Sequence, residues 1–183
     1  VEKALLESED RFRSYVENAV DVVFTLDQNG NFTYVSPNWR LNLGHRSEDV
    51  LGKSFAEFVH PDDVQLGYVY IKKILEQEAV TESLEYRARH IDGHYRWQSS
   101  RGSLLKHDKI ISILGVAHDI DDLKRAENEI IQSERTYRGI INQISEAVYI
   151  QSNDGRFLDV NTTALDFYGY DRTHFIGNTP DFL

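Results

Sequence analysis

Residues 84–97 read LEYRARHIDGHYRW, and this stretch decides the fold. Over its first six positions apolar residues alternate with charged ones, which is the period of a β-strand that has one face in water. Asp92-Gly93 then gives a turn signal, and a second strand-like run begins directly after it. The pattern predicts a hairpin of an antiparallel sheet.

More strand-like runs and several short helices surround this hairpin. We expect strands over Val22–Leu26, Phe32–Val35, Thr81–Ile91, His94–Lys106 and Lys109–Ile120, with an Asn29-Gly30 turn between the first two. Helical signals lie between the second and third strands, over Ser36–Gly44, Ser47–Gly52, Ser54–Val59 and Pro61–Glu78. The element order predicts an α+β fold, a five-stranded antiparallel sheet with helices on one face.

Start signals mark two of these helices. Ser36-Pro37 is typical of an N-cap residue followed by proline at the first helical position. Asp62 and Asp63 place negative charge at the positive end of the longer helix. Because the same reasoning applies to Asp121-Asp122, we attribute these carboxylates to helix stabilisation and not to acid–base catalysis.

The chain repeats itself with an offset of 125 residues. Without a gap, Ser8 matches Ser133, Gly30 matches Gly155, Phe32 matches Phe157, Val35 matches Val160, Gly44 matches Gly169 and Gly52 matches Gly177. We interpret this as the duplication of one domain. It predicts an amphipathic N-terminal helix over residues 1–20, a complete domain over 21–120, a connecting helix over 121–145 and a truncated start of a second domain over 146–183. Because the chain begins with Val, we expect a piece of a longer protein.

Composition excludes several classes of function. The formal charge of −10, with no cluster of Lys or Arg, repels phosphate backbones, so nucleic acid is not an expected partner. The chain has no Cys, which rules out disulfides, thiolate metal sites, cysteine nucleophiles and flavin–cysteine adducts. No apolar run reaches bilayer length and no signal-peptide pattern is present, so we expect a cytoplasmic segment. Whether the whole protein is attached to a membrane stays open.

Several segments together resemble the PAS family. They are residues 27–38, Gly44 with residues 48–54, residues 60–63, 85–87, 92–97 and 115–120, in the order that the family has. The family's Asp-Ile-Thr exit motif is here Asp119-Ile120-Asp121, in which Asp can still cap the following helix. The resemblance implies the PAS fold with its C-terminal PAC motif, in a signalling protein such as a sensor histidine kinase or diguanylate cyclase.

PAS relatives hold flavin, haem or small ligands between the helices and the sheet. By resemblance and alternation, the expected lining of such a cavity is Phe24, Leu26, Tyr34, Trp39, Phe55, Phe58, Ile71, Ile74, Tyr86, Trp97 and Ile113. The alternative is that these bulky side chains fill the core and leave no room for a ligand.

The sequence gives no sign of catalysis or metal binding. A haem would need an axial ligand, for which His60 and His45 are the candidates, but a histidine at a helix start is more often a cap or exposed. The other histidines show no metal-ligand spacing, and no nucleophile elbow, phosphate-binding loop or metalloprotease motif occurs. We expect no catalytic residue, no metal site and no haem, and the cofactor, if any, is open.

The connecting helix has a seam of residues spaced by three and four, namely Leu123, Ala126, Ile130, Ser133, Tyr137, Ile140 and Ile144, which is typical of a parallel coiled coil. We expect a signal to pass from the sheet into this helix through Asp119, Asp121, Leu123, Ile130, Tyr137 and Ile140. The partners would be a second copy of the chain and a downstream output domain. The alternative is that the helix packs on its own domain.

These observations leave three functions open. The main hypothesis is a regulatory module that senses a small ligand or relays a conformational signal to an output domain. The first alternative is a dimerisation scaffold that binds no ligand, and the second is a haem or flavin redox sensor.

Overall fold

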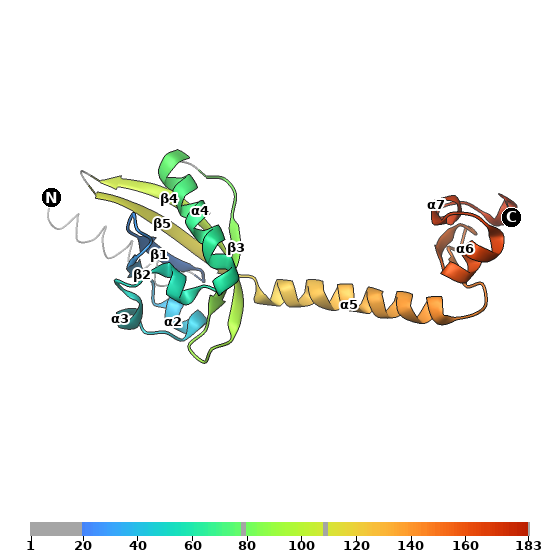
Figure 1. Cartoon of the computed structure of the whole chain (residues 1–183), viewed down its shortest axis with the longest axis horizontal. Helices are drawn as coiled ribbons and strands as arrows, with labels where there is room; N and C mark the ends of the chain where they lie inside the picture. The colour runs from blue at the N-terminus through green and yellow to red at the C-terminus, as the bar shows by residue number, and fades with distance from the viewer. Residues whose placement is uncertain (1–19, 78–79, 108–109, 183) are drawn as a thin grey trace. The chain divides into compact units, whose positions relative to one another are not determined.

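The computed structural model describes residues 20–77, 80–107 and 110–182. The chain divides into two compact units, Val1–Lys124 and Arg125–Leu183, and each is described here by itself (Figure 1). The N-terminal helix that we expect over residues 1–20 lies almost entirely outside the described residues, and so do Leu5 and Phe12 of its apolar face.

The first unit is built on a five-stranded antiparallel sheet. Its strands are β1 (Val22–Leu26), β2 (Phe32–Val35), β3 (Leu84–Arg89), β4 (Tyr95–His107) and β5 (Ile110–Asp119). They lie in the order β2-β1-β5-β4-β3, so the first and last strands of the unit are neighbours at its centre. The predicted fold class is confirmed.

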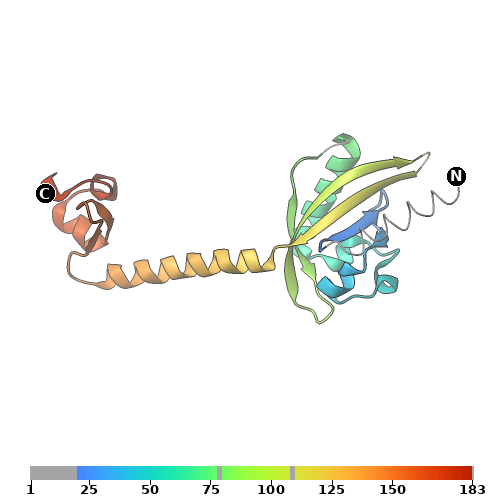
Figure 2. The ribbon, with the colours of Figure 1, turned by 180° about the vertical axis from the view of Figure 1, so that it is seen from behind.

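Among the described residues, the helices that follow β2 lie on one face of the sheet (Figures 1 and 2). They are α2 (Asn38–Leu43), α3 (Ser47–Val50), the short 3-10 helix η1 (Phe55–Phe58) and α4 (Pro61–Gln77). All four fall where the sequence predicts them. Ser36, however, is not the side-chain cap of α2, because its hydroxyl accepts the backbone N–H of Val23, 3.0 Å away on β1.

An aromatic cluster forms the core between the two layers. Phe32 contacts Phe24, Trp39 and Phe58 edge to face, with ring centroids between 4.9 and 5.8 Å apart. Branched aliphatic side chains from α3, α4 and β5 complete this core. The fixed positions of the rings determine how much space is left beside them.

The second unit contains part of the 23-residue helix α5 (Asp121–Gln143) and a small αβ cluster after it. The cluster consists of β6 (Tyr149–Gln151), β7 (Phe157–Val160), α6 (Thr162–Tyr168), α7 (Arg172–Phe175) and the 3-10 helix η2 (Pro180–Phe182). Strand β6 pairs with β7 at Tyr149↔Val160 and Gln151↔Phe157. The pairs of β1 with β2 are Phe24↔Val35 and Leu26↔Phe32, so the two registers match at an offset of 125 residues.

Asn161 holds this second unit together from a fully buried position. Its amide nitrogen donates to the carbonyls of Ile141 and Glu146, and its Oδ1 accepts the N–H groups of Val148 and Ala164. Asn161 is 125 residues after Ser36, whose hydroxyl accepts the matching N–H of Val23. An amide therefore replaces a hydroxyl in the same backbone arrangement and adds bonds to the segment after α5.

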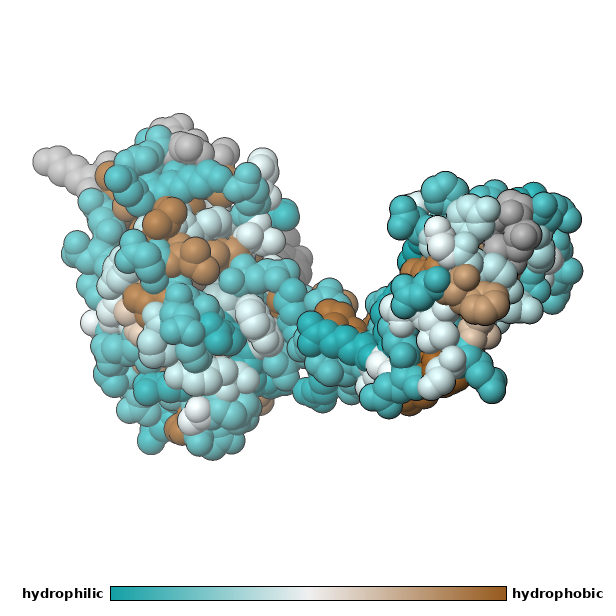
Figure 3. All heavy atoms as spheres, turned by 45° about the vertical axis from the view of Figure 1, so that its right-hand side comes forward, coloured by the Kyte–Doolittle hydropathy of each residue, from teal (hydrophilic) through white to brown (hydrophobic). Residues whose placement is uncertain are grey.

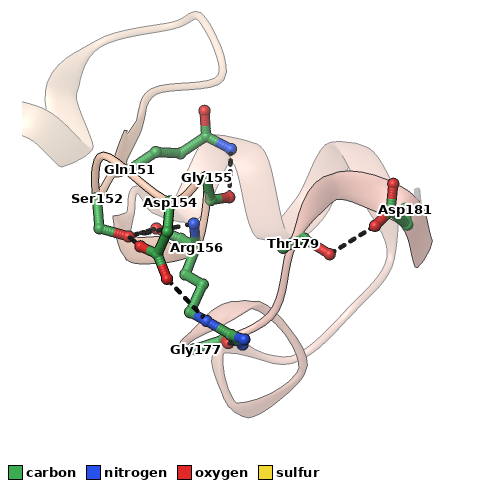
Figure 4. A network of polar contacts seen from close by, with 8 residues as sticks. All are labelled: Gln151, Ser152, Asp154, Gly155, Arg156, Gly177, Thr179 and Asp181. Carbon is green, nitrogen blue, oxygen red and sulfur yellow. Dashed lines mark hydrogen bonds and ion pairs between the residues drawn. The ribbon is translucent and has the colours of Figure 1, made fainter.

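The β6–β7 turn is closed by side chains (Figure 4). The Ser152 hydroxyl and the Arg156 Nε both donate to the Asp154 carboxylate, at 2.5 and 3.1 Å. Arg156 also donates to the carbonyl of Gly177, 2.7 Å away, and so ties the turn to the segment after α7. In the first unit the Asp27 carboxylate closes the equivalent turn, accepting the backbone N–H groups of Asn29 and Asn31 and the side-chain amide of Asn31.

Candidate functional site: a cavity under the helices and a polar junction at the sheet end

A cavity of about 60 Å³ lies in the first unit between the helices and the sheet. Its lining is mostly apolar and comes from the strands β1 to β5 and from α2, η1 and α4. The lining residues are Phe24, Leu26, Phe32, Trp39, Phe55, Phe58, Val59, Asp63, Gly67, Tyr70, Ile71, Ile74, Leu84, Tyr86, Ala88, Ser100, Arg101, Gly102, Ile113 and Gly115.

Nine of the eleven residues that the sequence suggests for the lining are among these, and Tyr34 and Trp97 are not. Tyr34 is 41% exposed on β2. Trp97 precedes the buried Gln98 on β4, so by alternation it points to the opposite face. There the guanidinium of Arg87 and the ammonium of Lys124 lie 5.6 and 5.7 Å from its ring centre. Both residues are aromatic, but Trp97 has the wrong strand parity, and Tyr34 pairs with Thr25 beyond the register shift that separates it from the Leu26↔Phe32 pair.

The sheet below the cavity carries two paired glycines, Gly102 on β4 and Gly115 on β5. A Cβ at Gly115 would lie 2.2 Å from the Phe24 ring, and one at Gly102 would lie 2.5 Å from the Ile74 side chain. Real Cβ atoms do not approach so closely, so the bare backbone is what lets these two side chains rest on the sheet.

Few polar groups reach this cavity, and one of them lacks a partner. Trp39 is 5% exposed, and its Nε1 is buried without a hydrogen-bond partner among the described residues. The Tyr86 hydroxyl, by contrast, is 2.8 Å from the Ser100 hydroxyl, and burial raises the pKa of Tyr86. An unpaired buried donor is costly, so the Trp39 N–H would gain from an acceptor.

The size of the cavity limits what it can hold. An apolar cavity of about 150 Å³ accepts benzene, so 60 Å³ suits a ligand of a few heavy atoms with the side chains as they stand. The two histidines considered as haem ligands do not line it. His45 Nε2 is 2.9 Å from the carbonyl of Arg89, and His60 Nδ1 accepts the N–H of Asp62 at 3.2 Å.

A polar junction joins α2 to the end of the sheet. Asn42, one turn after Trp39 on α2, donates to the Asp119 carboxylate at 3.2 Å. Its side-chain oxygen accepts from Gln98 at 3.0 Å, and its backbone carbonyl accepts from Arg96 at 3.1 Å. Arg96 also pairs with Asp119 at 3.0 Å. The Asp119 carboxylate therefore contacts both α2 and β4.

The same carboxylate holds the start of α5. Asp119 Oδ1 accepts the backbone N–H of Asp121 at 2.9 Å, and Asp121 Oδ1 accepts the backbone N–H of Trp97 at 3.2 Å. Asp119 and Asp121, which the sequence suggests for the signal relay, are in contact here. Asn42, Arg96 and Gln98 were missed, because a single polar residue on a short helix gives no signal of a partner 56 or 77 positions away.

Comparison with known proteins agrees with this architecture. A family model described as the PAS fold matches residues 32–117, and a second, described as the PAS domain, matches residues 135–182. Both matched segments belong to the PAS family. A sensory box histidine kinase/response regulator from Burkholderia thailandensis has a similar solved structure, 28% identical with a TM-score of 0.54, over 70% of this chain and 98% of that one.

Curated relatives of this PAS chain are longer proteins. An uncharacterized protein of Sinorhizobium fredii is 26% identical over 157 residues, which are 84% of this chain and 19% of the relative. The probable diguanylate cyclase DgcE of Escherichia coli is 26% identical over 127 residues, 68% of this chain and 12% of the relative. As a PAS chain the protein is a sensory or signalling module, a type that is typically non-catalytic.

Helix α5 of the PAS chain carries large apolar side chains in water (Figure 3). Leu123, Ile130 and Ile140 are 55%, 69% and 59% exposed. Tyr137 differs from these predicted seam residues, because it is partly buried beside Asp159 of β7. Burial and this carboxylate raise the pKa of the Tyr137 hydroxyl. Among the described residues, no helix has the length and apolar character needed to cross a membrane.

Proposed function

We propose that the first unit senses a small molecule in the cavity and passes the change to α5 through Asp119. The observation that carries this proposal is the position of Asn42 on α2. Trp39 lines the cavity, and Asn42, three residues later on the same short helix, donates to Asp119. A ligand that moves Trp39 must move Asn42 with it, because a six-residue helix shifts as one body.

The ligand class follows from the lining. Apolar walls favour a small, mostly apolar molecule, and the unpaired Trp39 Nε1 favours one hydrogen-bond acceptor on it. A larger ligand would require Phe55 and its neighbours to change rotamer.

The signal would reach α5 as a change in its first turn. Asp119 and Asp121 together make three of the bonds that fix this turn to β4 and α2. If α2 shifts, the Asp119 carboxylate would lose either its hydrogen bond from Asn42 or its hydrogen bond from the backbone N–H of Asp121. Either loss would change the direction or the stability of the first turn of α5.

The partner that we propose for α5 is a second copy of the chain. Leu123, Ile130 and Ile140 repeat at the spacing of a coiled-coil seam and are more than half exposed, and a parallel pair of helices would bury them against each other. Tyr137, held by the second unit, would contribute less than the isoleucines. The scaffold alternative shares this dimer but requires no ligand.

Residues 146–183 would form the opening elements of a second PAS domain, with residues 121–145 as the connecting helix. The matching strand registers and the family match over residues 135–182 support this. The output domain in the whole protein would be of the kind found in the relatives, a histidine kinase or a diguanylate cyclase.

Native mass spectrometry of the purified chain tests the sensing role. We expect a native mass that exceeds the denatured mass by one small molecule per chain, and we expect Trp39→Phe to lose this excess. Trp97→Phe is the matched control, because that tryptophan lies outside the lining, and it should retain the molecule.

Xenon, which binds apolar cavities, serves as a probe for a ligand lost during purification. Saturable NMR shifts at Ile74 and Ile113 that extend to Asp119 and Asp121 are expected. Equal native and denatured masses together with no saturable response to xenon would favour the scaffold alternative.

A further inference from the structure

The turn between β3 and β4 contains a group of side chains that the proposed sensing mechanism does not use. It reads His90-Ile91-Asp92-Gly93-His94, and none of the five residues lines the cavity. The sequence alone does not predict a metal site here, because two histidines four residues apart are common in many contexts.

Closure of the hairpin brings the two histidines to the same side. The N–H of His90 donates to the carbonyl of His94 at 2.8 Å, and the N–H of Gly93 donates to the carbonyl of His90 at 3.0 Å. Gly93 has a φ of 96°, which a glycine adopts without strain. The two imidazoles consequently stack, with centroids 4.5 Å apart and planes 20° from parallel.

One oxygen of the Asp92 carboxylate faces the Nδ1 atoms of both rings. This oxygen, Oδ1, is 2.9 Å from His90 Nδ1 and 2.5 Å from His94 Nδ1. One ligand atom from each of the three residues lies within 4.8 Å of the others. The side chains of His90, Asp92 and His94 are 23%, 58% and 54% exposed, so an ion can reach them without opening the fold.

We propose that His90, Asp92 and His94 bind one divalent transition-metal ion, of which Zn²⁺ is the natural test case. Two imidazole nitrogens and one carboxylate oxygen suit first-row transition metals better than Mg²⁺ or Ca²⁺, which prefer oxygen ligands. Zn²⁺ takes three protein ligands and water at distances of about 2.0–2.2 Å. Ligand atoms at these distances in a tetrahedron lie about 3.4 Å apart, so Asp92 Oδ1 and the two imidazole nitrogens, now 2.9 and 2.5 Å away, would have to move slightly apart to admit the ion.

An ion here would act on the link between the hairpin and α2. The N–H of Ile91 donates to the carbonyl of Leu43, the last residue of α2, at 2.9 Å. His45 Nε2 lies 2.9 Å from the carbonyl of Arg89, just before the turn. A metal that stiffens the turn would hold the C-terminal end of α2 more firmly, but binding itself does not depend on the sensing role.

Isothermal titration calorimetry of the full chain with ZnCl₂ tests the site, with His94→Gln and Asp92→Asn as variants. His118→Gln is the matched control, because His118 also faces a carboxylate, that of Asp21 at 2.6 Å, but has no third ligand in the described chain. We expect one Zn²⁺ per chain in the parent protein and the control, and binding at least tenfold weaker in both variants.

Imidazole ¹⁵N NMR provides the second readout, since it assigns the bound nitrogens independently of the fold's stability. Zn²⁺ should shift the signals of His90 and His94 and leave that of His174 unchanged. Binding of equal strength in all four proteins, shifts at other histidines, or no saturable binding up to millimolar ZnCl₂ would overturn the proposal.

Discussion

Asp63 at the start of α4 accepts three hydrogen bonds from Arg87 of β3. The backbone N–H and Nε of Arg87 both donate to Oδ2 at 2.9 Å, and Nη2 donates to Oδ1 at 2.7 Å. This pair attaches the helix that covers the cavity to the edge strand of the sheet. The Arg87 guanidinium holds the pKa of the Asp63 carboxyl below its usual range.

We expect Asp63→Asn to destabilise the first unit by about 2 kcal/mol at pH 7, because it removes the charged acceptor of three hydrogen bonds and leaves Arg87 only the exposed Asp62 carboxylate, 3.5 Å from Nη2. The pKa of Asp63 is lower in the folded than in the unfolded state, so its contribution is present above the unfolded pKa and is lost as the pH falls through the folded value. The difference in the free energy of unfolding between the parent protein and Asp63→Asn, measured by urea denaturation, should therefore be smaller below pH 4 than at pH 7. Asp62→Asn, at a side chain that is 76% exposed, is the control and should cost much less.

Substitution Gly115→Ala should destabilise the first unit by about 1–3 kcal/mol, because the new methyl group would displace the Phe24 ring. Thermal unfolding measures the loss, and NMR shifts of cavity residues should accompany it. Gly139→Ala is the opposite case, since Gly139 lies inside α5 with nothing within 4 Å of an added Cβ. It should stabilise the helix by up to about 1 kcal/mol. A neutral Gly115 variant would mean that Phe24 is free to move.

Substitution Asn42→Ala should loosen the first turn of α5 without emptying the core. The Asp119 carboxylate loses one hydrogen-bond donor. The reporter is the backbone amide of Lys124, which donates to the carbonyl of Ile120 in the first turn of α5. If this turn loses about 1.4 kcal/mol of stability, the amide should exchange about tenfold faster. Hydrogen exchange followed by NMR resolves this amide. Leu41→Ala, at an 82% exposed neighbour on the same helix, should leave the exchange rate unchanged, and an equal effect in both variants would remove Asn42 from the relay.

The combination Ile130→Asp with Ile140→Asp should weaken self-association of the chain at least tenfold if α5 pairs with a second copy, because each Asp places a charge in the apolar seam. Sedimentation equilibrium measures the dimer. Ile131→Asp alone, compared with Ile130→Asp alone, separates seam from surface, since Ile131 is also 45% exposed but lies off the seam. Unchanged oligomer mass in the double variant would sink the dimer proposal.

We expect Asn161→Ala to cost the second unit about 2–4 kcal/mol, since it leaves several buried backbone groups without partners. Ser36→Ala at the matching position of the first unit should cost less, because one backbone N–H depends on that hydroxyl. Residue-resolved hydrogen exchange distinguishes the two units in the same chain. Equal costs would show that the extra bonds of Asn161 contribute nothing.

The sequence predicted the strands and helices well because each has a strong local signal. Strand β3 alternates apolar and charged residues, and α4 begins at proline followed by two carboxylates. The order of the strands in the sheet has no such local signal, because it depends on which strands pair with each other and not on the residues of any single strand. The order of the elements, with the helical signals between the second and third strands, supplied the expectation that helices cover one face.

The candidate site was predictable only as far as local patterns reach. Aromatic character suggested both Trp39, which lines the cavity, and Trp97, which does not. The strand parity of β4 becomes definite only when its pairing with β3 is known. Ser36 was misread as a cap, since its partner Val23 is 13 residues earlier. The relay partner Asn42 and the cluster of His90, Asp92 and His94 likewise arise from contacts that only the folded backbone creates.

The antiparallel pairing of β1 with β5 has a consequence for how such proteins grow. Because Val22 faces Ala117 across the sheet, the chain comes into the domain and leaves it at neighbouring points on one end. A domain built in this way can be inserted into a longer polypeptide while the segments before and after it stay close together. Duplication of such a unit in place then gives a string of domains on one continuous chain.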